Sequence, residues 1–198
     1  MQNDPFPLII GFMAPFCGVS ERVMLTPRCD SSRNQELKNA LIVIDIQNDY
    51  FPGGAFPLEG ADTACQAAVS AIEKARGEGW LIVAIQHIAT ADAPFFKPDS
   101  EGANIHPSIV AALGDAPVVV KKEADSFYQT RLESLLRDSG ITDLYLTGMM
   151  TQHCVTHTAL SPQGQGMNVH IIAAGCAAPS KALSDLALSG LAVRCRIQ

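Results

Sequence analysis

Three residue types that can act together in catalysis occur at widely separated points of this 198-residue sequence. They are the carboxylate of Asp45, the ammonium of Lys121 and the thiol of Cys154. A catalytic thiol needs a lowered pKa, which a nearby ammonium and a helix N-terminus can provide. A carboxylate within reach can take the thiol proton and pass it to a leaving group. The set predicts a cysteine nucleophile that attacks a carbonyl carbon, with backbone N–H groups at a helix start as an oxyanion hole.

Each of these residues has a simpler interpretation when it is taken alone. A single cysteine is usually a small core residue, Asp45 could cap a turn, and Lys121 could be a solvated residue at a strand end. Lys122 is a second candidate for the ammonium, because side chains alternate along a strand and only one of the two lysines can point into a site. It is the combination that favours catalysis.

The elements that must position these groups follow from an alternation of short β-branched apolar runs with helical patterns. We expect strands at 40–45, 80–87, 116–121, 144–148 and 168–174, and helices at 61–78, at 126–139 and from about Thr151. This order predicts right-handed βαβ units and a three-layer α/β/α sandwich with a mostly parallel sheet. The three candidate groups then reach the carboxyl edge of the sheet, where ligands bind in such folds.

Composition narrows the class of protein. With 47% hydrophobic and 17% charged residues, a folded domain is expected, which we place at residues 39–198. Residues 1–38 lack clear periodicity and are interpreted as a poorly ordered extension. A net charge of −6 with scattered basic residues argues against a nucleic-acid partner. No apolar run approaches the ~18 residues of a membrane span, and six cysteines without a CxxC pair favour a reduced, cytoplasmic location.

The histidines offer two further possibilities. His157 lies three residues after the thiol on the same helical face, so a Cys–His dyad is conceivable, whereas His153 should point elsewhere. His87 and His106 could bind a metal, but Ile85 stands where an Asp or His would complete a ligand cluster. We therefore expect no metal. No GxGxxG follows the first strand, which disfavours a nucleotide cofactor.

Three segments, "LIVIDIQNDYFPGG", "VVVKKEADSF" and "LYLTGMMTQHCV", resemble the isochorismatase-like cysteine hydrolases, a family that includes nicotinamidases and other small amidohydrolases. The resemblance covers roughly residues 40–177. It implies that Asp45, Lys121 and Cys154 form the catalytic triad, because the six-residue distance to Phe127 matches the family spacing for this lysine and not for its neighbour.

The resemblance also implies features around the triad. It places a cis peptide bond at Met149–Met150 and assigns the N–H groups of Met150 and Cys154 to the oxyanion hole. Gln47 and Phe51 fall where family members often line the substrate pocket. The family further implies a homo-oligomer and a small-molecule substrate, and the residues themselves predict no cofactor.

The sequence departs from the family pattern at several points, of which two bear most on function. It lacks the Asp-x-His motif of metal-dependent nicotinamidases, so nicotinamide is not the favoured substrate. The C-terminal "KALSDLALSGLAVRCRIQ" is short and is interpreted as lacking the family's final helix. We predict cleavage of a small-molecule amide or carbamate-type C–N bond through a thioester-type intermediate on Cys154. The alternatives are isochorismatase-type vinyl ether hydrolysis, which needs no cysteine, and a catalytically silent α/β domain with a binding or assembly role.

Overall fold

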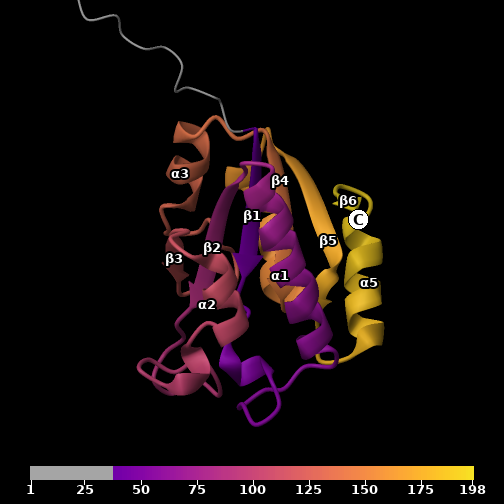
Figure 1. Cartoon of the computed structure of the whole chain (residues 1–198). Helices are drawn as coiled ribbons and strands as arrows, with labels where there is room; N and C mark the ends of the chain where they lie inside the picture. The colour runs from indigo at the N-terminus through magenta and orange to yellow at the C-terminus, as the bar shows by residue number, and fades with distance from the viewer. Residues whose placement is uncertain (1–37) are drawn as a thin grey trace, which may run out of the picture. The chain divides into compact units, whose positions relative to one another are not determined.

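The structure is a computed structural model that describes residues 38–198. The extension predicted at residues 1–38 lies outside the described residues apart from Lys38. One sheet runs through the domain in the order β3-β2-β1-β4-β5-β6, and every neighbouring pair is parallel (Figure 1). Its strands are β1 (Asn39–Ile44), β2 (Leu81–His87), β3 (Val118–Lys121), β4 (Asp143–Met149), β5 (Asn168–Ala177) and β6 (Arg196–Ile197).

β1 lies at the centre of the sheet because its sequence, NALIVI, is apolar on both faces. Its residues 40–44 are at most 1% exposed, as expected for a parallel strand covered by helices on both sides. Its register pairs Ile42 with Val83 of β2 and with Leu146 of β4. The five predicted strands correspond to β1–β5 with small shifts at their ends, and β6 was not predicted.

Helices cover both faces of the sheet and confirm the three-layer sandwich. They are α1 (Ala61–Gly77), α2 (Pro107–Leu113), α3 (Leu132–Asp138), α4 (Thr156–Ala159) and α5 (Lys181–Leu191), and η4 (Thr151–Val155) is a π-helical turn. α1 and α2 cover the face turned to the viewer in Figure 1 and bury Ala68, Ile72 and Ile109. The core on the other face includes Leu132 and Leu136 of α3. Among the described helices, none is both long enough and apolar enough to cross a membrane.

The helix predicted at 126–139 begins only at Leu132. The preceding residues form turns because side chains take up their backbone groups: the N–H of Ser126 donates to Thr158 Oγ1 at 3.1 Å, and its carbonyl accepts from Thr130 Oγ1 at 2.7 Å. Gln129 has a left-handed φ of 54°. Local bonds of this kind compete with the helical ladder. The segment 88–108, predicted as a long loop, contains a single 3-10 turn, η3 (Glu101–Ala103), and the first residues of α2.

The prediction that the C-terminus lacks a final helix is wrong. α5 spans Lys181–Leu191 and begins at Ser180, whose hydroxyl accepts a hydrogen bond from the Leu183 N–H. Such a cap satisfies one of the free N–H groups of a helix start and is worth about 1 kcal/mol. Leu191 at the end of the helix is 2% exposed and belongs to the core. The segment is therefore short but complete, and the chain then adds β6 to the sheet edge.

Candidate active site

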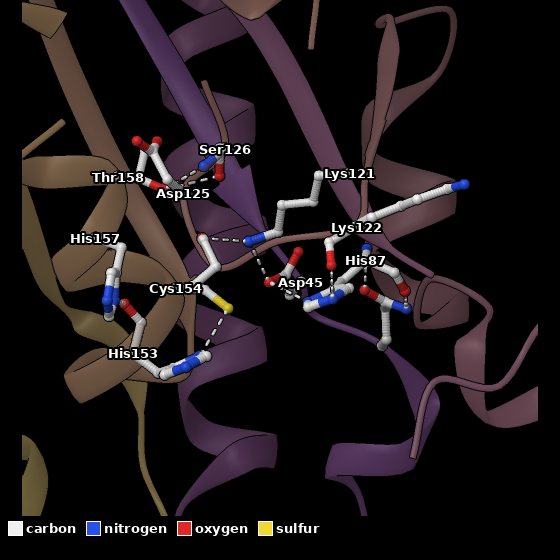
Figure 2. Close-up of polar contacts among 12 residues, drawn as sticks. Asp45, His87, Lys121, Lys122, Asp125, Ser126, His153, Cys154, His157 and Thr158 are labelled. Atoms are coloured by element: carbon white, nitrogen blue, oxygen red, sulfur yellow. Dashed lines mark hydrogen bonds and ion pairs between the residues drawn. The ribbon is translucent and has the colours of Figure 1, made fainter. Parts of the chain in front are cut away.

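The candidate site lies where the strand order of the sheet reverses. β1 and β4 are neighbours, yet the chain continues from them towards opposite edges of the sheet, and such a switch point opens a crevice at the carboxyl ends of the strands. Asp45 follows β1, Lys121 is the last residue of β3, and Cys154 belongs to the turn after β4. Figure 2 shows the three side chains pointing toward one another.

A tight approach of β1 and β4 brings the first and last of these segments together. Gly148 in β4 has a φ of 129°, and a Cβ on it would lie 2.0 Å from the Ile44 carbonyl oxygen. Any side chain at this position would therefore push β4 away from β1 just before both strands deliver their site residues. Asp45 itself has a φ of 48°, a left-handed conformation that is uncommon for a non-glycine residue and is often found at functional sites.

Asp45 and Lys121 form a fully buried ion pair. Lys121 Nζ lies 2.8 Å from Asp45 Oδ2, and both side chains are 0% exposed. The ammonium also donates to the Ala124 carbonyl oxygen at 2.8 Å. Lys122 is exposed, so the alternation along β3 turns Lys121 and not its neighbour toward Asp45. Of the two lysines that the sequence left open, the structure brings Lys121 to the site.

Cys154 is presented by an unusual turn. The peptide bond between Met149 and Met150 is cis, and the π-helical η4 follows at once. The thiol is 1% exposed. Its sulfur, one carboxylate oxygen of Asp45 and one ring nitrogen of His87 all lie within 4.8 Å of one another. The triad predicted from the sequence is thus spatially close.

The C-terminal helix anchors this turn. Thr151 Oγ1 donates to the Ala177 carbonyl oxygen of β5 at 3.0 Å and is hydrogen-bonded to Ser184 Oγ of α5 at 2.9 Å. Both Thr151 and Ser184 are buried. Because a buried hydroxyl pair has a strict geometry, these bonds fix η4 against both the sheet and α5. The segment that the sequence suggested was missing therefore helps to hold the turn that carries Cys154.

The charges of the site follow from its burial. Burial raises the pKa of the Cys154 thiol above its ordinary range, and the charge of Asp45 raises it further, while Lys121 acts in the opposite direction. Burial disfavours the Lys121 ammonium, but the negative charge of Asp45 and interactions with Cys154 outweigh it, so the pKa of Lys121 is raised. Burial thus favours the neutral form of the Cys154 thiol, contrary to the lowered pKa that the sequence predicts.

The histidines of η4 and α4 are arranged differently from the sequence-based expectation. His153 Nδ1 lies 3.4 Å from Cys154 Sγ, so the prediction that His153 points elsewhere is wrong. His157 Nδ1 instead bonds to the His153 carbonyl oxygen at 2.8 Å, and the structure does not form the Cys154–His157 dyad. The reason is the π-helical turn, whose i→i+5 pattern contains more residues per turn than an α-helix and changes which residues share a face.

His87 is a member of the site that the sequence treated only as a metal ligand. Its Nδ1 lies 4.0 Å from Asp45 Oδ2, and its Nε2 lies 3.2 Å from the Lys122 carbonyl oxygen. Burial lowers the pKa of His87, although Asp45 opposes this shift, so the ring is neutral near pH 7. The sequence contained a sign of this position, because His87 and Lys121 each end a predicted strand. In the structure the two residues are paired in the register of β2 and β3, at the same sheet edge.

Gln47 and Phe51, predicted to line the substrate pocket, are not among the residues that line the cavity beside the triad. The buried Gln47 amide accepts from the His87 N–H at 2.7 Å and donates to the His87 carbonyl at 2.9 Å and the Ala103 carbonyl at 2.7 Å. Phe51 stacks on the His106 ring with centroids 4.1 Å apart. Gln47 thus supports the end of β2, and contact of either residue with a substrate stays a prediction.

A cavity of about 470 Å³, here called the active-site cavity, opens beside the triad. It is lined by His87, Lys122, Glu123, Ala124, Asp125, Tyr128, His153 and His157. His87 and His153 both line the cavity and face the buried triad, so they form its inner wall. A larger cavity of about 710 Å³ lies near the amino ends of β4 and β5, by Asp143 and Asn168, at the sheet edge opposite the triad.

A buried thiol beside a carboxylate–ammonium pair at the switch point of a parallel sheet is an arrangement that can support nucleophilic catalysis in an α/β protein. An isochorismatase domain matches residues 39–197, and the chain belongs to this family of hydrolases.

Relatives and solved structures agree with this assignment. The chain is 35% identical over 150 residues to the uncharacterized isochorismatase family protein YddQ of Bacillus subtilis, covering 75% of this chain and 83% of that protein. It is 29% identical over 176 residues to the nicotinamidase of Escherichia coli, covering 69% and 82%. A crystal structure of a protein assigned as an isochorismatase hydrolase from Oleispira antarctica superposes with a TM-score of 0.76 at 32% identity, covering 82% and 93%.

The residues present do not fit the metal centre of metal-dependent nicotinamidases. Ile85, which lies two residues before His87, is buried in the core and offers no ligand atom, so His87 does not end an Asp-x-His motif. The His106 ring is turned toward Cys65, with Nδ1 at 3.6 Å from the sulfur and accepting from the Ser108 N–H.

Proposed function

We propose that this chain is a cysteine amidohydrolase that cleaves an amide or carbamate-type C–N bond of a small molecule. The observation that carries the proposal is the ion pair of Asp45 and Lys121, 2.8 Å apart and 0% exposed, next to the thiol of Cys154. A buried charged pair without a role is costly to maintain. The position of this ion pair beside a thiol gives it a role in proton transfer and charge stabilisation.

The first half of the reaction forms a thioester. Asp45 takes the proton from the Cys154 thiol as the sulfur attacks the carbonyl carbon, and the developing oxyanion accepts hydrogen bonds from the N–H groups of Met150 and Cys154. The C–N bond then breaks, and Asp45 returns the proton to the departing nitrogen, which leaves as ammonia or an amine. The acyl group remains on sulfur.

The second half restores the enzyme. Asp45 takes a proton from water as its oxygen attacks the thioester, the C–S bond breaks, and the proton returns to the sulfur of Cys154. The Lys121 ammonium, 2.8 Å from Asp45 Oδ2, stabilises negative charge on the sulfur during both steps. Because the resting thiol has a raised pKa, proton transfer to Asp45 accompanies attack and does not precede it.

The choice of amide chemistry has support beyond the thiol. The relative from E. coli is a nicotinamidase, an amide hydrolase by name. Vinyl ether hydrolysis, the second activity considered, needs no nucleophilic cysteine, and no contact of this site favours it. A silent domain is disfavoured because η4 is anchored by Thr151 and Ser184 to an intact α5. A homo-oligomer and a cytoplasmic location stay predictions of the sequence, which sedimentation and fractionation would test.

The test is ammonia release from a panel of primary amides, carbamates and ureas. Cys154→Ala should lower kcat/KM by roughly 1,000-fold or more, as expected when a covalent nucleophile is removed. Cys195→Ala, which removes another buried thiol far from the triad, should retain activity. Undiminished turnover in Cys154→Ala contradicts the mechanism.

The base requires a separate test, because His153 Nδ1 is a second acceptor within reach of the thiol. Asp45→Asn should abolish turnover, whereas His153→Phe should leave a measurable rate. If His153→Phe is inactive and Asp45→Asn is active, the base is His153.

A further inference from the structure

A buried pair of hydroxyl groups joins the segment after β3 to the helix that follows the candidate nucleophile. Thr158 Oγ1 of α4 donates to Ser126 Oγ at 2.8 Å and accepts from the Ser126 N–H at 3.1 Å. Both residues are at most 1% exposed. Figure 2 shows the two side chains facing each other across these bonds. Because each hydrogen bond has its own geometric requirement, two of them between the same residues fix both distance and orientation.

Each half of this hydroxyl link is close to a reacting group. On one side, the Lys121 ammonium donates to the Ala124 carbonyl oxygen at 2.8 Å, and Ser126 follows two residues later in the same segment. On the other side, Thr158 follows Cys154 by four residues, which is about one helical turn. A continuous path of contacts therefore runs from the helix of the thiol to the ammonium.

The segment that carries Ser126 is held at several backbone groups, so the position of one residue determines that of its neighbours. The Ser126 carbonyl accepts from Thr130 Oγ1 at 2.7 Å, and the Phe127 N–H donates to Asp125 Oδ1 at 2.9 Å. Phe127 is 1% exposed and belongs to the core on this face of the sheet. A segment with bonded backbone groups and a buried aromatic ring has little freedom to move by itself.

We propose that the hydroxyl link sets the distance between the Lys121 ammonium and the Cys154 sulfur. Ser126 and Thr158 are then positioning residues. This inference rests on the proposed amidohydrolase function, in which the ammonium stabilises negative charge on the sulfur, an effect that depends on their separation. The sheet does not fix that separation directly, because β2 and β1 lie between β3 and β4. The hydroxyl link supplies a direct connection between the segments that follow β3 and β4.

Two substitutions at Thr158 separate its hydroxyl from the rest of the side chain. Thr158→Val keeps the size of the side chain and removes both hydrogen bonds, because valine has neither donor nor acceptor. Thr158→Ser keeps the hydroxyl and removes a methyl group. The matched control is Thr147→Val, which removes another buried hydroxyl, one that donates to the Gly175 carbonyl oxygen at 2.9 Å between β4 and β5.

The first experiment measures kcat and KM with the fastest amide of the ammonia-release panel, well below the unfolding temperature of each variant. Thr158→Val should lower kcat by roughly 10- to 100-fold, the loss that a misplacement of about 1 Å can cause. It should change KM by less than about 3-fold, because the loss concerns the chemical step. Thr158→Ser should recover most of the lost kcat. Thr147→Val should lower stability without lowering kcat.

The second experiment needs no substrate and uses urea unfolding in a double-mutant cycle. The hydroxyl link holds the segment whose Ala124 carbonyl binds the Lys121 ammonium, so the two perturbations act on one network. The decrease in urea midpoint caused by Thr158→Val should therefore be smaller in the Lys121→Met background than in the unsubstituted protein. The decreases caused by Thr147→Val and Lys121→Met should add.

The outcomes separate this inference from the proposed function. Equal losses of kcat in Thr158→Val and Thr147→Val, or an unchanged kcat in Thr158→Val, overturn the positioning role, while Cys154→Ala still reports on the nucleophile. A loss in Thr158→Ser as large as that in Thr158→Val also overturns it, because the hydroxyl would then have no effect. If no amide of the panel is cleaved, the proposed function fails, and additive midpoint shifts in the urea cycle overturn the hydroxyl link separately. If Thr158→Val does not fold, Ser126→Ala, which removes the acceptor of the Thr158 hydroxyl, takes its place in both experiments.

Discussion

Removal of the ammonium from the buried ion pair should cost the domain a large part of its stability. In Lys121→Met the Asp45 carboxylate stays 0% exposed but loses the partner that lies 2.8 Å away. At that distance the attraction is about 6 kcal/mol with an effective dielectric constant near 20. The desolvation of both groups offsets much of this attraction, so the pair as a whole contributes little. The unpaired carboxylate that is left behind is what costs energy.

The expected loss is about 3–5 kcal/mol in the free energy of unfolding, the range measured when one partner of a buried pair is removed. For a domain of this size it corresponds to a Tm lower by roughly 6–20 °C. The double variant Asp45→Asn/Lys121→Met should recover most of the loss, because no charge remains buried. Urea unfolding of the four proteins of this cycle gives the coupling energy directly.

Lys122→Met is the matched control, since this neighbouring lysine is exposed and should change stability by no more than about 0.5 kcal/mol. The reasoning is refuted if Lys121→Met is as stable as Lys122→Met. It is also refuted if the double variant is no more stable than Lys121→Met, because the cost would then not come from an unpaired charge.

Three further predictions concern the thiol and the turn that presents it. The pKa of Cys154 is raised above its ordinary value of about 8.5, so iodoacetamide should label this thiol slowly at pH 8 and faster as the pH approaches that higher pKa. Asp45→Asn should speed labelling, because the charge of Asp45 raises the pKa of Cys154. An unchanged labelling rate, measured by mass spectrometry, would show that this charge has no effect. Thr151→Val leaves the Ala177 carbonyl without its buried donor. This variant should lower the free energy of unfolding by about 1–3 kcal/mol and should also reduce kcat. A loss of stability with unchanged kcat would mean that the bond does not position Cys154. Gly148→Ala would place a Cβ 2.0 Å from a backbone oxygen and should give little folded protein, as judged by circular dichroism; a well-folded, active variant would show that β1 and β4 can separate at this point.

Much of the fold and part of the site could be predicted from the sequence. The apolar run at 40–45 and the lysine closing the segment 116–121 identified two strand ends, and the chain order fixed a parallel sheet. Sequence periodicity reports burial on each element, which is why these predictions hold. The helix α5 was missed because its family likeness was weak, although its cap Ser180 and its leucines were visible.

Other parts of the site depended on contacts that local patterns do not contain. The choice between Lys121 and Lys122 from residue pattern alone required the strand phase, and the roles of His153 and His157 depended on a π-helical turn that an α-helical spacing rule misplaces. A turn of that kind is a departure from regular geometry, so periodicity cannot report it.

The sequence by itself determined the three chemical groups and the sheet edge to which they belong, because residue type and strand position are local properties of the chain. Only the tertiary structure decided how those groups are charged and what surrounds them. The ion pair and the raised pKa of Cys154 arise from burial. His87 Nδ1, which has no hydrogen-bond partner among residues 38–198, is held near Asp45 by the hydrogen bonds of Gln47 to the His87 backbone. Desolvation and hydrogen bonding depend on distances between segments far apart in the chain, and the folded protein sets those distances.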